Sequence, residues 1–247
     1  METMDIHIHA STHGTILYDA ASVPQIDHAW FDPDHWRRGG RLQGRGGGRA
    51  SASFIDSPAG ECVLRHYHRG GMVANVLGDR YLWTGRDNTR SFAEFRLLAH
   101  MCGQALPVPV PLAARYVRRG IHYTADLITR RIEQSRTLAE CLRAEALDAS
   151  LAEACGVLVA RFHQHGVWHA DLNAHNILVT DASNYIIDFD RGELRKPAPA
   201  WQQSNLRRLR RSLVKLGAAR HGEDVFEKHV WLPLMRGYTQ RMETSSR

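Results

Sequence analysis

The chain has 247 residues, enough to bury a sizeable core in one two-lobed domain or in two small domains. Its composition is that of an ordinary globular protein, and no stretch reaches the roughly 18 apolar residues of a membrane-spanning helix. The N-terminal segment has an early acidic residue and no continuous apolar run, so we expect a protein that is neither exported nor integral to a membrane. The formal net charge of +6 favours anionic partners.

Cysteine and histidine spacing gives little support for a metal site or a disulfide framework. The four cysteines are Cys62, Cys102, Cys141 and Cys155. They contain no C-x-x-C pair, which indicates buried or free thiols in a reducing compartment. We interpret His7 and His9, with His13 nearby, as a polar stretch that is mobile or at a strand edge rather than as metal ligands.

The N-terminal half begins with the two-residue periodicity of strands. A glycine-rich stretch at 39–48 precedes RASASFID, in which Ala50, Ala52 and Phe54 alternate with polar residues. After a turn at 57–60, ECVLRHY predicts a second strand. The two segments together predict a β-hairpin with a glycine-rich loop before it.

One helix and further extended segments complete this half. SFAEFRLLAHM, residues 91–101, predicts a helix, with Ser91 and Glu94 at the spacing of a capping box. The proline run at 107–111 ends the helix and leads into extended segments, the last of which is IHYTADLITRRI. We therefore expect the first 132 residues to form a small sheet with one main helix.

The C-terminal half is predicted to be mostly helical. Two more capping-box pairs occur here, Thr137 with Glu140 and Ser150 with Glu153. The second pair opens an amphipathic pattern that ends near Gly166, after which NILV and YIID flank the turn residues 180–184 as a short hairpin does. The sequence predicts an α+β fold with two lobes, a small β-rich N-lobe at 1–133 and a mainly helical C-lobe at 134–247.

The segment HADLNAHN carries the strongest functional signal. It places His169, Asp171 and Asn176 at the spacing of the kinase catalytic loop H-R-D-L-x-x-x-N. IIDFD follows, with Asp188 in the position of the D-F-G aspartate. Two motifs in the right order predict a protein-kinase-like fold and phosphoryl transfer.

Each of these residue types suits one part of that chemistry. Asp171 is the candidate catalytic residue, because an aspartate on a loop can position the attacking hydroxyl and accept its proton. Asn176 and Asp188 are the candidate metal ligands, because Mg²⁺ prefers oxygen donors. The alternative is that Asp171 and Asn176 only stabilise turns, but that role does not require the second motif downstream.

The predicted N-lobe offers candidates for binding ATP phosphates. The backbone N–H groups of Gly46, Gly47 and Gly48 have no Cβ in the way of a phosphate, although such a run also suits a flexible linker. No lysine precedes residue 196, so Arg65 of VLR occupies the position of the V-A-I-K lysine. Glu94 is its candidate carboxylate partner, unless it only caps its own helix.

The differences from protein kinases bear on the phosphate acceptor. Ala170 replaces the catalytic-loop arginine, no A-P-E segment follows, and the helical pattern resumes near Trp201. There is little room for an activation loop or a peptide platform, so we expect a small-molecule hydroxyl as acceptor. Asp190 replaces the D-F-G glycine, and either a metal or water contact or a reshaped turn remains open for it.

Taken together, the motifs resemble a known family. VLRHYHRGG, DRYLWTG with TRSFAEFRLL, LPVPVPLAARY, HADLNAHNILV and IIDFDRG span about residues 44–195. They resemble the 3-deoxy-D-manno-octulosonic acid (Kdo) kinases, relatives of the lipopolysaccharide heptose kinases within the eukaryotic-like kinase superfamily. The segment after Arg195 matches less clearly.

The resemblance implies a substrate, a cofactor and a location. It implies an enzyme that uses ATP and Mg²⁺ to phosphorylate a hydroxyl, expected to be the 4-OH, of Kdo on a lipid A precursor. It places the enzyme as a peripheral protein at the cytoplasmic face of the bacterial inner membrane. The alternatives are a kinase of lipopolysaccharide heptose or of another small molecule, and a nucleotide-binding module without transfer.

A basic amphipathic pattern at 205–217 bears on the membrane. Its leucines form one helical stripe, and five of the remaining positions are basic: Arg207, Arg208, Arg210, Arg211 and Lys215. The helix either lies on an anionic membrane surface or packs its leucines into the C-lobe with its arginines in solvent. Nucleic acid is not an expected partner, because the run lacks interleaved aromatic residues. No oligomeric state follows from the sequence.

Overall fold

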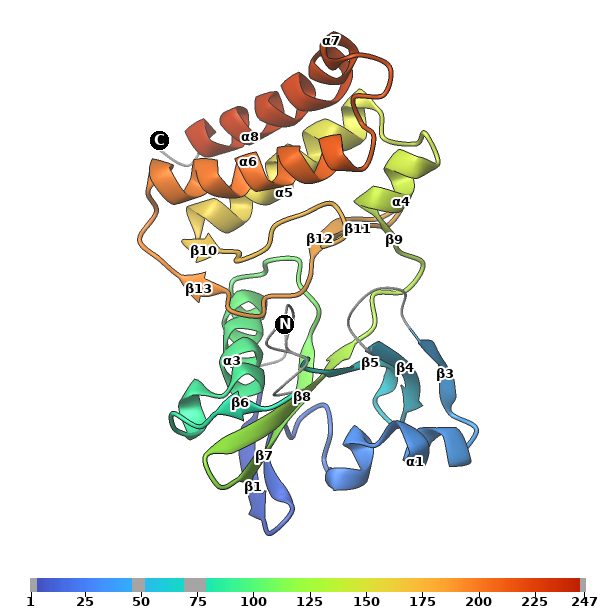
Figure 1. The fold of residues 1–247 in the computed structure, drawn as a ribbon, viewed down its shortest axis with the longest axis vertical. Helices are drawn as coiled ribbons and strands as arrows, with labels where there is room; N and C mark the ends of the chain where they lie inside the picture. The colour runs from blue at the N-terminus through green and yellow to red at the C-terminus, as the bar shows by residue number, and fades with distance from the viewer. Residues whose placement is uncertain (1–3, 46–51, 69–78, 245–247) are drawn as a thin grey trace. The chain divides into compact units, whose positions relative to one another are not determined.

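The computed structural model describes residues 4–45, 52–68 and 79–244 (Figure 1). The chain divides into two compact units. The N-terminal unit contains residues 1–103 and 109–132, and the C-terminal unit contains residues 104–108 and 133–247. Figure 1 shows that most strands belong to the first unit and most long helices to the second.

The described part of the N-terminal unit is built on an eight-stranded antiparallel sheet in the order β1-β2-β7-β8-β5-β4-β3, with β6 paired to β8. The strands are β1 (Ile6–Ser11), β2 (Gly14–Asp19), β3 (Leu42–Arg45), β4 (Ala52–Ser57), β5 (Gly60–His66), β6 (Tyr81–Leu82), β7 (Pro111–Arg119) and β8 (His122–Arg130). The predicted hairpin is confirmed as β4 and β5, and β3 pairs with β4 on its other side. Strand β2 was not predicted, and for the polar residues of β1 the sequence left a mobile stretch and a strand edge open. His7 and His9 lie exposed on β1, the edge strand.

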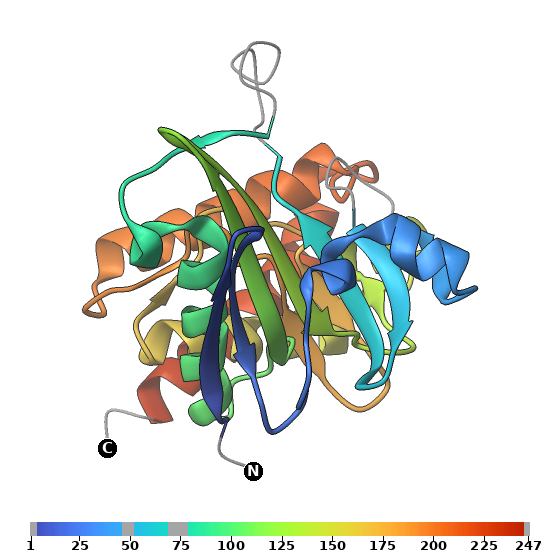
Figure 2. The same ribbon diagram turned by 90° about the horizontal axis from the view of Figure 1, so that it is seen from below.

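Helices cover both faces of this sheet. They are the short helices η1 (His28–Phe31), α1 (Pro33–Arg38) and η2 (Arg86–Asn88), and the longer α3 (Arg90–Gly103). Neighbouring residues of β7 point to opposite faces, as strand geometry requires. The Arg115 guanidinium lies 4.8 Å from the Phe31 ring centroid, whereas the Tyr116 ring contacts Phe92 of α3. Figure 2 shows α3 running along the sheet, packed against β7 and β8.

The predicted helix at 91–101 is confirmed as α3, but its predicted capping box is wrong. Ser91 lies inside the helix, and its hydroxyl donates to the backbone carbonyl of Arg115 (2.8 Å). The Glu94 carboxylate is held by Arg65 and Tyr67 instead. Side-chain pairing with the sheet therefore outweighs the local capping pattern.

The C-terminal unit combines helices with short strands. The helices are α4 (Leu138–Arg143), α5 (Ala149–Gln164), α6 (Pro199–Lys215), α7 (Glu223–Phe226), the π-helical turn η3 (Glu227–Trp231) and α8 (Leu232–Thr244). The strands are β9 (Arg136–Thr137), β10 (Val167–Trp168), β11 (Ile177–Val179), β12 (Asn184–Ile186) and β13 (Glu193–Leu194). The predicted hairpin is confirmed as β11 and β12, with Ile177 opposite Ile186. Strand β9 joins β11, and β10 pairs with β13.

Helix caps in this unit confirm one prediction and correct another. Thr137 and Glu140 form a capping box at α4, with both reciprocal hydrogen bonds present. The predicted box at Ser150 and Glu153 is wrong, because Asp148 caps α5 through the backbone N–H of Leu151 (2.8 Å). An aspartate two residues earlier thus takes the capping position that the pattern assigned to the serine.

The core of the C-terminal unit forms where α5 packs against α8. Gly156 of α5 and Gly237 of α8 lie at this crossing, and a Cβ atom at either would overlap backbone of the other helix. Helix α6 buries Leu206, Leu209 and Leu213, while Leu216 beyond its end is 37% exposed. Within residues 4–45, 52–68 and 79–244, no helix is both long and apolar enough to cross a bilayer.

Candidate active site

In the N-terminal unit, Arg65 of β5 forms an ion pair with Glu94 of α3, as the sequence predicted. The Glu94 side chain is only 3% exposed, and that of Arg65 is 15% exposed. A buried carboxylate is costly unless it is paired, so this contact fixes α3 to the sheet and orients the guanidinium.

Tyr67 completes this cluster, and sequence reasoning missed it. Its hydroxyl donates to the Glu94 carboxylate (2.5 Å) and accepts from Arg65 (3.1 Å). The Arg65 guanidinium also lies 4.7 Å from the centroid of the Tyr67 ring. The signal was present in the sequence, because Tyr67 follows Arg65 by two residues and shares its side of the strand.

His66, between them, faces a different polar network. Its Nδ1 lies 2.7 Å from the Asp126 carboxylate and its Nε2 lies 2.8 Å from the Asp79 carboxylate. Asp126 also accepts from the Nε of Arg115 (2.9 Å). The hydrogen bond to Asp126 outweighs burial and holds the pKa of His66 above its ordinary value. The network connects β5 to β7 and β8 through charged side chains.

In the C-terminal unit, His169 organises the predicted catalytic loop. It is 3% exposed, and burial lowers its pKa. Its Nε2 lies 3.0 Å from the carbonyl of Ile187 and must donate to it, so the neutral ring accepts through Nδ1 from the backbone N–H of Asp171 (3.0 Å). One imidazole therefore connects the loop at Asp171 to the strand end beside Asp188.

The Asp171 side chain extends from this loop with 56% of its surface exposed. One carboxylate oxygen accepts from Arg208 of α6 (3.1 Å), and the other accepts from the Asn173 amide (3.1 Å). Asn173 also donates to the Asp171 carbonyl (2.9 Å). The carboxylate is thus held from two sides while it stays accessible to solvent.

Asn176 and Asp188, the predicted metal ligands, lie at the same end of the β11–β12 hairpin. The backbone N–H of Ile187 donates to the carbonyl of Asn176 (3.0 Å), one pair beyond the Ile177–Ile186 register. The Asn176 amide nitrogen donates to the Asp171 carbonyl (3.0 Å). The side-chain amide oxygen Oδ1 of Asn176 has no hydrogen-bond partner among the described residues, so it is available to coordinate a metal ion.

The segment around Asp188 is fixed by the buried residue that follows it. Phe189 is 1% exposed, stacks on Phe162 of α5 (ring centroids 5.7 Å apart), and contacts the His169 ring. Asp188 itself has φ of +64°, in the left-handed region that costs energy for a residue with a Cβ atom. Such a conformation persists only where the surroundings impose it, and here it turns the chain between a strand and a buried ring.

Helix α6 contacts the catalytic loop through three polar residues on one face, which we name the contact stripe: Asn205, Arg208 and Ser212. The Asn205 amide donates to the His169 carbonyl (2.8 Å), and the Ser212 hydroxyl accepts from the backbone N–H of Ala174 (3.1 Å). With the Arg208 bond to Asp171, the stripe binds the loop at three successive points. Sequence reasoning assigned Arg208 to a basic surface and missed these contacts.

The residues present fit a magnesium ion. Asn176 and Asp188 supply oxygen donors, and Mg²⁺ typically takes one or two such side chains together with phosphate oxygens and water. Among the described residues, no group of three or more His, Cys, Asp or Glu side chains could form a closed metal cage. Such a sparse donor set suits an ion that arrives with a nucleotide. The predicted phosphate-binding Gly46, Gly47 and Gly48 lie outside the described residues.

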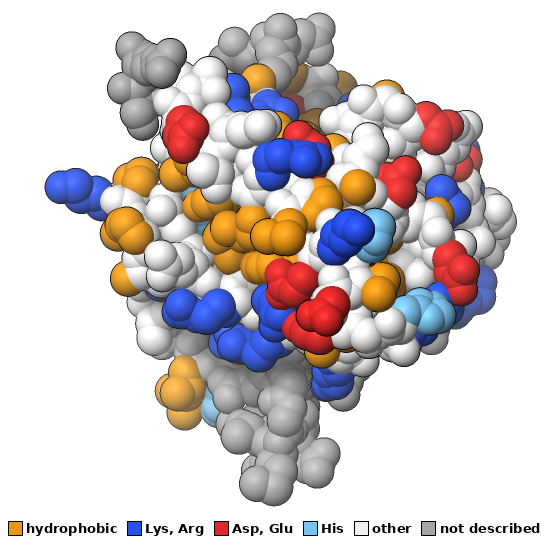
Figure 3. All heavy atoms as spheres, turned by 90° about the horizontal axis from the view of Figure 1, so that it is seen from above, with side chains coloured by type: hydrophobic (Ala, Val, Ile, Leu, Met, Phe, Trp, Pro, Cys, Tyr) orange, Lys and Arg blue, Asp and Glu red, His pale blue; other side chains and the backbone are white. Residues whose placement is uncertain are grey.

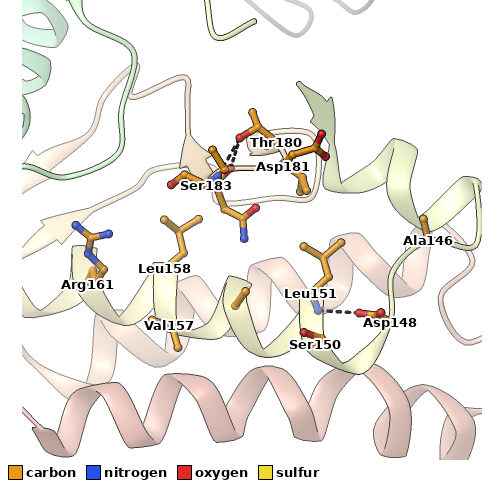
Figure 4. Close-up of a pocket in the computed structure, with 14 residues that line it drawn as sticks. Ala146, Asp148, Ser150, Leu151, Val157, Leu158, Arg161, Thr180, Asp181 and Ser183 are labelled. Carbon is orange, nitrogen blue, oxygen red and sulfur yellow. Dashed lines mark hydrogen bonds between the residues drawn. The ribbon is translucent and has the colours of Figure 1, made fainter. Parts of the chain in front are cut away.

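A pocket of about 520 Å³ lies elsewhere in the C-terminal unit. Figure 4 shows that it lies between α5 and the turn that joins β11 to β12. Two of its polar side chains are already bonded, because the Thr180 hydroxyl donates to the Ser183 carbonyl (2.7 Å) and Asp148 caps α5. None of the predicted site residues lines it.

Comparison with known proteins decides the family. The model of the lipopolysaccharide kinase (Kdo/WaaP) family matches residues 33–238. The chain belongs to this family. It is 50% identical over 220 residues to the 3-deoxy-D-manno-octulosonic acid kinase of Stenotrophomonas maltophilia strain R551-3, covering 89% of this chain and 88% of that one. It is also 50% identical over 221 residues to the protein of the same name from Xanthomonas axonopodis pv. citri strain 306.

A solved structure supports the fold. The protein described as WaaP in complex with acyl carrier protein matches with a TM-score of 0.51 and 18% sequence identity, over 81% of this chain and 80% of that one. The predicted α+β, protein-kinase-like fold is therefore confirmed. At this identity the likeness concerns the fold alone.

Proposed function

We propose that this family member is a 3-deoxy-D-manno-octulosonic acid kinase, which transfers the γ-phosphoryl group of ATP to a hydroxyl of Kdo on a lipid A precursor. The proposal rests above all on the relatives that carry this name, which are about half identical over almost the whole chain. The geometry of the catalytic loop supports the same reaction.

In the proposed reaction, Asp171 acts on the acceptor hydroxyl. The hydroxyl oxygen forms a bond to the γ-phosphorus, the bond from that phosphorus to the β–γ bridging oxygen breaks, and the hydroxyl proton passes to the Asp171 carboxylate. The exposure of this side chain and its two hydrogen-bond donors suit that role. His169 contributes indirectly by fixing the backbone of the loop.

Two other sets of residues are proposed to bind the nucleotide. Arg65, oriented by Glu94 and Tyr67, binds the α- and β-phosphates, with Gly46, Gly47 and Gly48 as further phosphate contacts. Asn176 and Asp188 hold Mg²⁺, which neutralises the phosphate charge that develops during transfer. Each assignment has its own test below.

A small-molecule acceptor is supported by the short segment after the D-F-D motif. The chain turns at Gly192, pairs briefly as β13 with β10, and enters α6 at Pro199. No stretch of the length of an activation loop or peptide platform occurs between Asp190 and Pro199. This favours a sugar over a protein substrate.

We further propose that the protein works as a peripheral protein on an anionic membrane, at the cytoplasmic face of the bacterial inner membrane. Arg207, Arg211 and Lys215 are exposed on α6, whereas Arg210 pairs with Glu223 and Glu227. Figure 3 shows apolar side chains gathered together and bordered by basic side chains, with acidic side chains also beside them. Exposed apolar and basic side chains together suit the surface of an anionic bilayer.

The decisive experiment uses the purified full-length chain with Mg²⁺, ATP and a Kdo-bearing lipid A precursor. Mass spectrometry should show an acceptor that gains one phosphate, and fragmentation should place it on Kdo. A neutral heptose acceptor should react far more slowly. ATP binding without phosphate transfer to any acceptor would instead support a nucleotide-binding module, and preference for heptose would support the alternative sugar.

A further inference from the structure

Arg208 donates a hydrogen bond to the proposed catalytic carboxylate of Asp171, and this bond uses only part of its hydrogen-bonding capacity. One Nη1 donor reaches the Asp171 carboxylate at 3.1 Å, and the Arg208 side chain is 44% exposed. A guanidinium has five N–H donors in a planar fork. Arg208 makes no other hydrogen bond or ion pair among the described residues, so the remaining N–H donors of this fork are available next to Asp171.

The position of Arg208 is fixed by its helix. Leu206 and Leu209 are buried on either side of it, and Asn205 and Ser212 bond to the catalytic loop before and after it in the contact stripe. A guanidinium on such a rigid element can recognise a planar anion with little loss of conformational entropy. Arg208 therefore has the preorganisation expected of a specificity group.

The acceptor chemistry supplies an anion for this fork. The reacting hydroxyl must come within hydrogen-bond reach of Asp171, about 2.6–3.2 Å, which brings its sugar ring next to Arg208. An octulosonic acid carries a carboxylate on that ring, whereas a neutral hexose or heptose does not. Arginine and carboxylate form a matched pair with two parallel hydrogen bonds.

From this geometry we infer that Arg208 binds the carboxylate of the acceptor sugar and makes the enzyme selective for acidic sugars. The inference rests on the proposed function, because it assumes an octulosonic acid as acceptor. Arg208 keeps its single bond to Asp171 and uses the outer edge of its fork for the substrate. Asp171 and the acceptor carboxylate would then share one cation, which places the reacting hydroxyl beside the carboxylate that accepts its proton.

The test combines a change in the enzyme with a change in the acceptor. Wild type, Arg208→Gln and Arg208→Lys are each assayed on a short soluble Kdo acceptor and on its neutral methyl ester. Wild type should prefer the acid by about 10- to 100-fold in kcat/KM, the range of a hydrogen-bonded charge pair. Arg208→Gln should lose that preference and use both acceptors within a few-fold. Arg208→Lys, which keeps the charge without the fork, should lie between them.

Controls separate this role from three others. Arg143→Gln removes another exposed arginine, from α4, and should keep the wild-type preference. If Arg208→Gln slows both acceptors equally, Arg208 serves only Asp171, and the inference is wrong. A raised KM for ATP with an unchanged acid preference would assign Arg208 to the nucleotide and also overturn it. If Arg143→Gln loses the acid preference to the same extent, the preference arises from the overall charge of the protein, and the inference about Arg208 is wrong.

Binding without ATP keeps the inference separate from the proposed function. Calorimetry with the acid and the ester should show tighter binding of the acid to wild type and equal binding of both to Arg208→Gln. If wild type fails to phosphorylate the acid, the proposed function fails, but this binding difference still tests Arg208. Equal binding of acid and ester to wild type would overturn the inference whatever the outcome of the kinase assay.

Discussion

Arg65 on β5 and Glu94 on α3, 29 residues apart, form an ion pair in which the carboxylate is almost completely buried. In the absence of any lysine before residue 196, this arginine is the cation at the position where kinases normally have lysine. As in protein kinases, the cation pairs with a glutamate. Here, however, the cation is the planar guanidinium of arginine instead of the ammonium group of lysine. We therefore expect the proposed nucleotide site to favour the geometry of a guanidinium over that of an ammonium group.

Replacing Arg65 tests this adaptation. Arg65→Ala should raise the KM for ATP and lower kcat, reducing kcat/KM on the order of 100-fold, because a charged partner of the phosphates is lost. Arg65→Lys should recover only part of the activity, since lysine is shorter and has no fork. Steady-state kinetics measure both constants, and thermal unfolding checks that each variant is folded. Full activity in the lysine variant would show that a point charge suffices, and unaffected kinetics in Arg65→Ala would remove Arg65 from the site.

Asp171→Ala should abolish transfer and leave ATP affinity within a few-fold. A group that acts on the hydroxyl affects the transition state more than nucleotide binding, and general-base contributions are about 10²–10⁴-fold. Single-turnover rates and nucleotide binding by calorimetry would measure both effects. Asp181→Ala, an exposed aspartate in the β11–β12 turn, is the matched control. An Asp171→Ala rate above about a tenth of wild type would exclude the proposed role.

Different substitutions can distinguish the proposed metal binding of Asn176 and Asp188 from the hydrogen bond that Asn176 makes to the catalytic loop. Asp188→Ala should be inactive and Asn176→Ala severely impaired, because the phosphate charge is left uncompensated. Asn176→Asp keeps the oxygen donor but loses the N–H bond to the Asp171 carbonyl, so it should retain more activity than Asn176→Ala. The readout is the Mg²⁺ concentration at half-maximal rate. Normal magnesium dependence in both alanine variants would contradict the assignment.

Membrane binding should depend on the basic residues of α6 that form no ion pair within the part of the chain that the structure describes. Replacing Arg207, Arg211 and Lys215 together by glutamine should release the protein from anionic vesicles, since each is worth on the order of 1 kcal/mol at such a surface. Co-sedimentation at two salt concentrations measures this, and the remaining binding should be insensitive to salt. Activity on a short soluble acceptor should survive.

A second triple variant controls for net charge in that experiment. Arg37, Arg38 and Arg41 are exposed on or beside α1 of the N-terminal unit, and their replacement by glutamine removes the same charge. This variant should stay bound to the vesicles. Equal release of both triples would mean that overall charge, and not the α6 surface, drives the attraction.

His163 should make the fold sensitive to acid. It is 1% exposed, lies 2.9 Å from the Tyr238 hydroxyl, and burial lowers its pKa to about 4. Because the ordinary pKa is about 6.5, the unfolded chain binds a proton between these values while the folded chain does not. The free energy of unfolding should therefore fall as pH drops from 6.5 towards 4, by at most about 3 kcal/mol from this residue.

Denaturant titrations across this pH range, compared between wild type and His163→Gln, would measure that contribution. The variant should be less stable at neutral pH, and its stability should fall less steeply with acid. His169, whose pKa burial also lowers, leaves some slope in the variant. Exposed His165→Gln serves as control and should follow wild type. Parallel curves for wild type and His163→Gln would contradict the prediction.

Sequence reasoning succeeded where the information is local and failed where a distant partner decides. The β4–β5 and β11–β12 hairpins follow from alternation and turn residues, and both are present. Of three capping boxes with the same spacing, only Thr137 with Glu140 forms. Glu94 of α3 pairs with Arg65 of β5 instead, and a local sequence pattern contains no information about that partner.

Strand β2 was missed for a different reason, because its sequence GTILYD contains the strand-forming residues Thr, Ile and Tyr. It pairs with the adjacent β1 as well as with β7, about a hundred residues later. The order of the catalytic motifs predicted that Asn176 and Asp188 would share a hairpin, and they lie at one end of it. The contact between Arg208 and Asp171 spans 37 residues and two element types, so an arginine-rich helix alone could not reveal it.

The contact stripe of α6 constrains which insertions and deletions this helix can tolerate. Each residue of an α-helix turns about 100° around the axis. One residue inserted between Asn205 and Ser212 would therefore rotate one of these side chains away from the catalytic loop and expose a buried leucine. Substitutions on the outward face, by contrast, leave the spacing intact. The length of this segment should thus stay fixed among functional variants, while insertions are accommodated after Leu216, where the helix has ended.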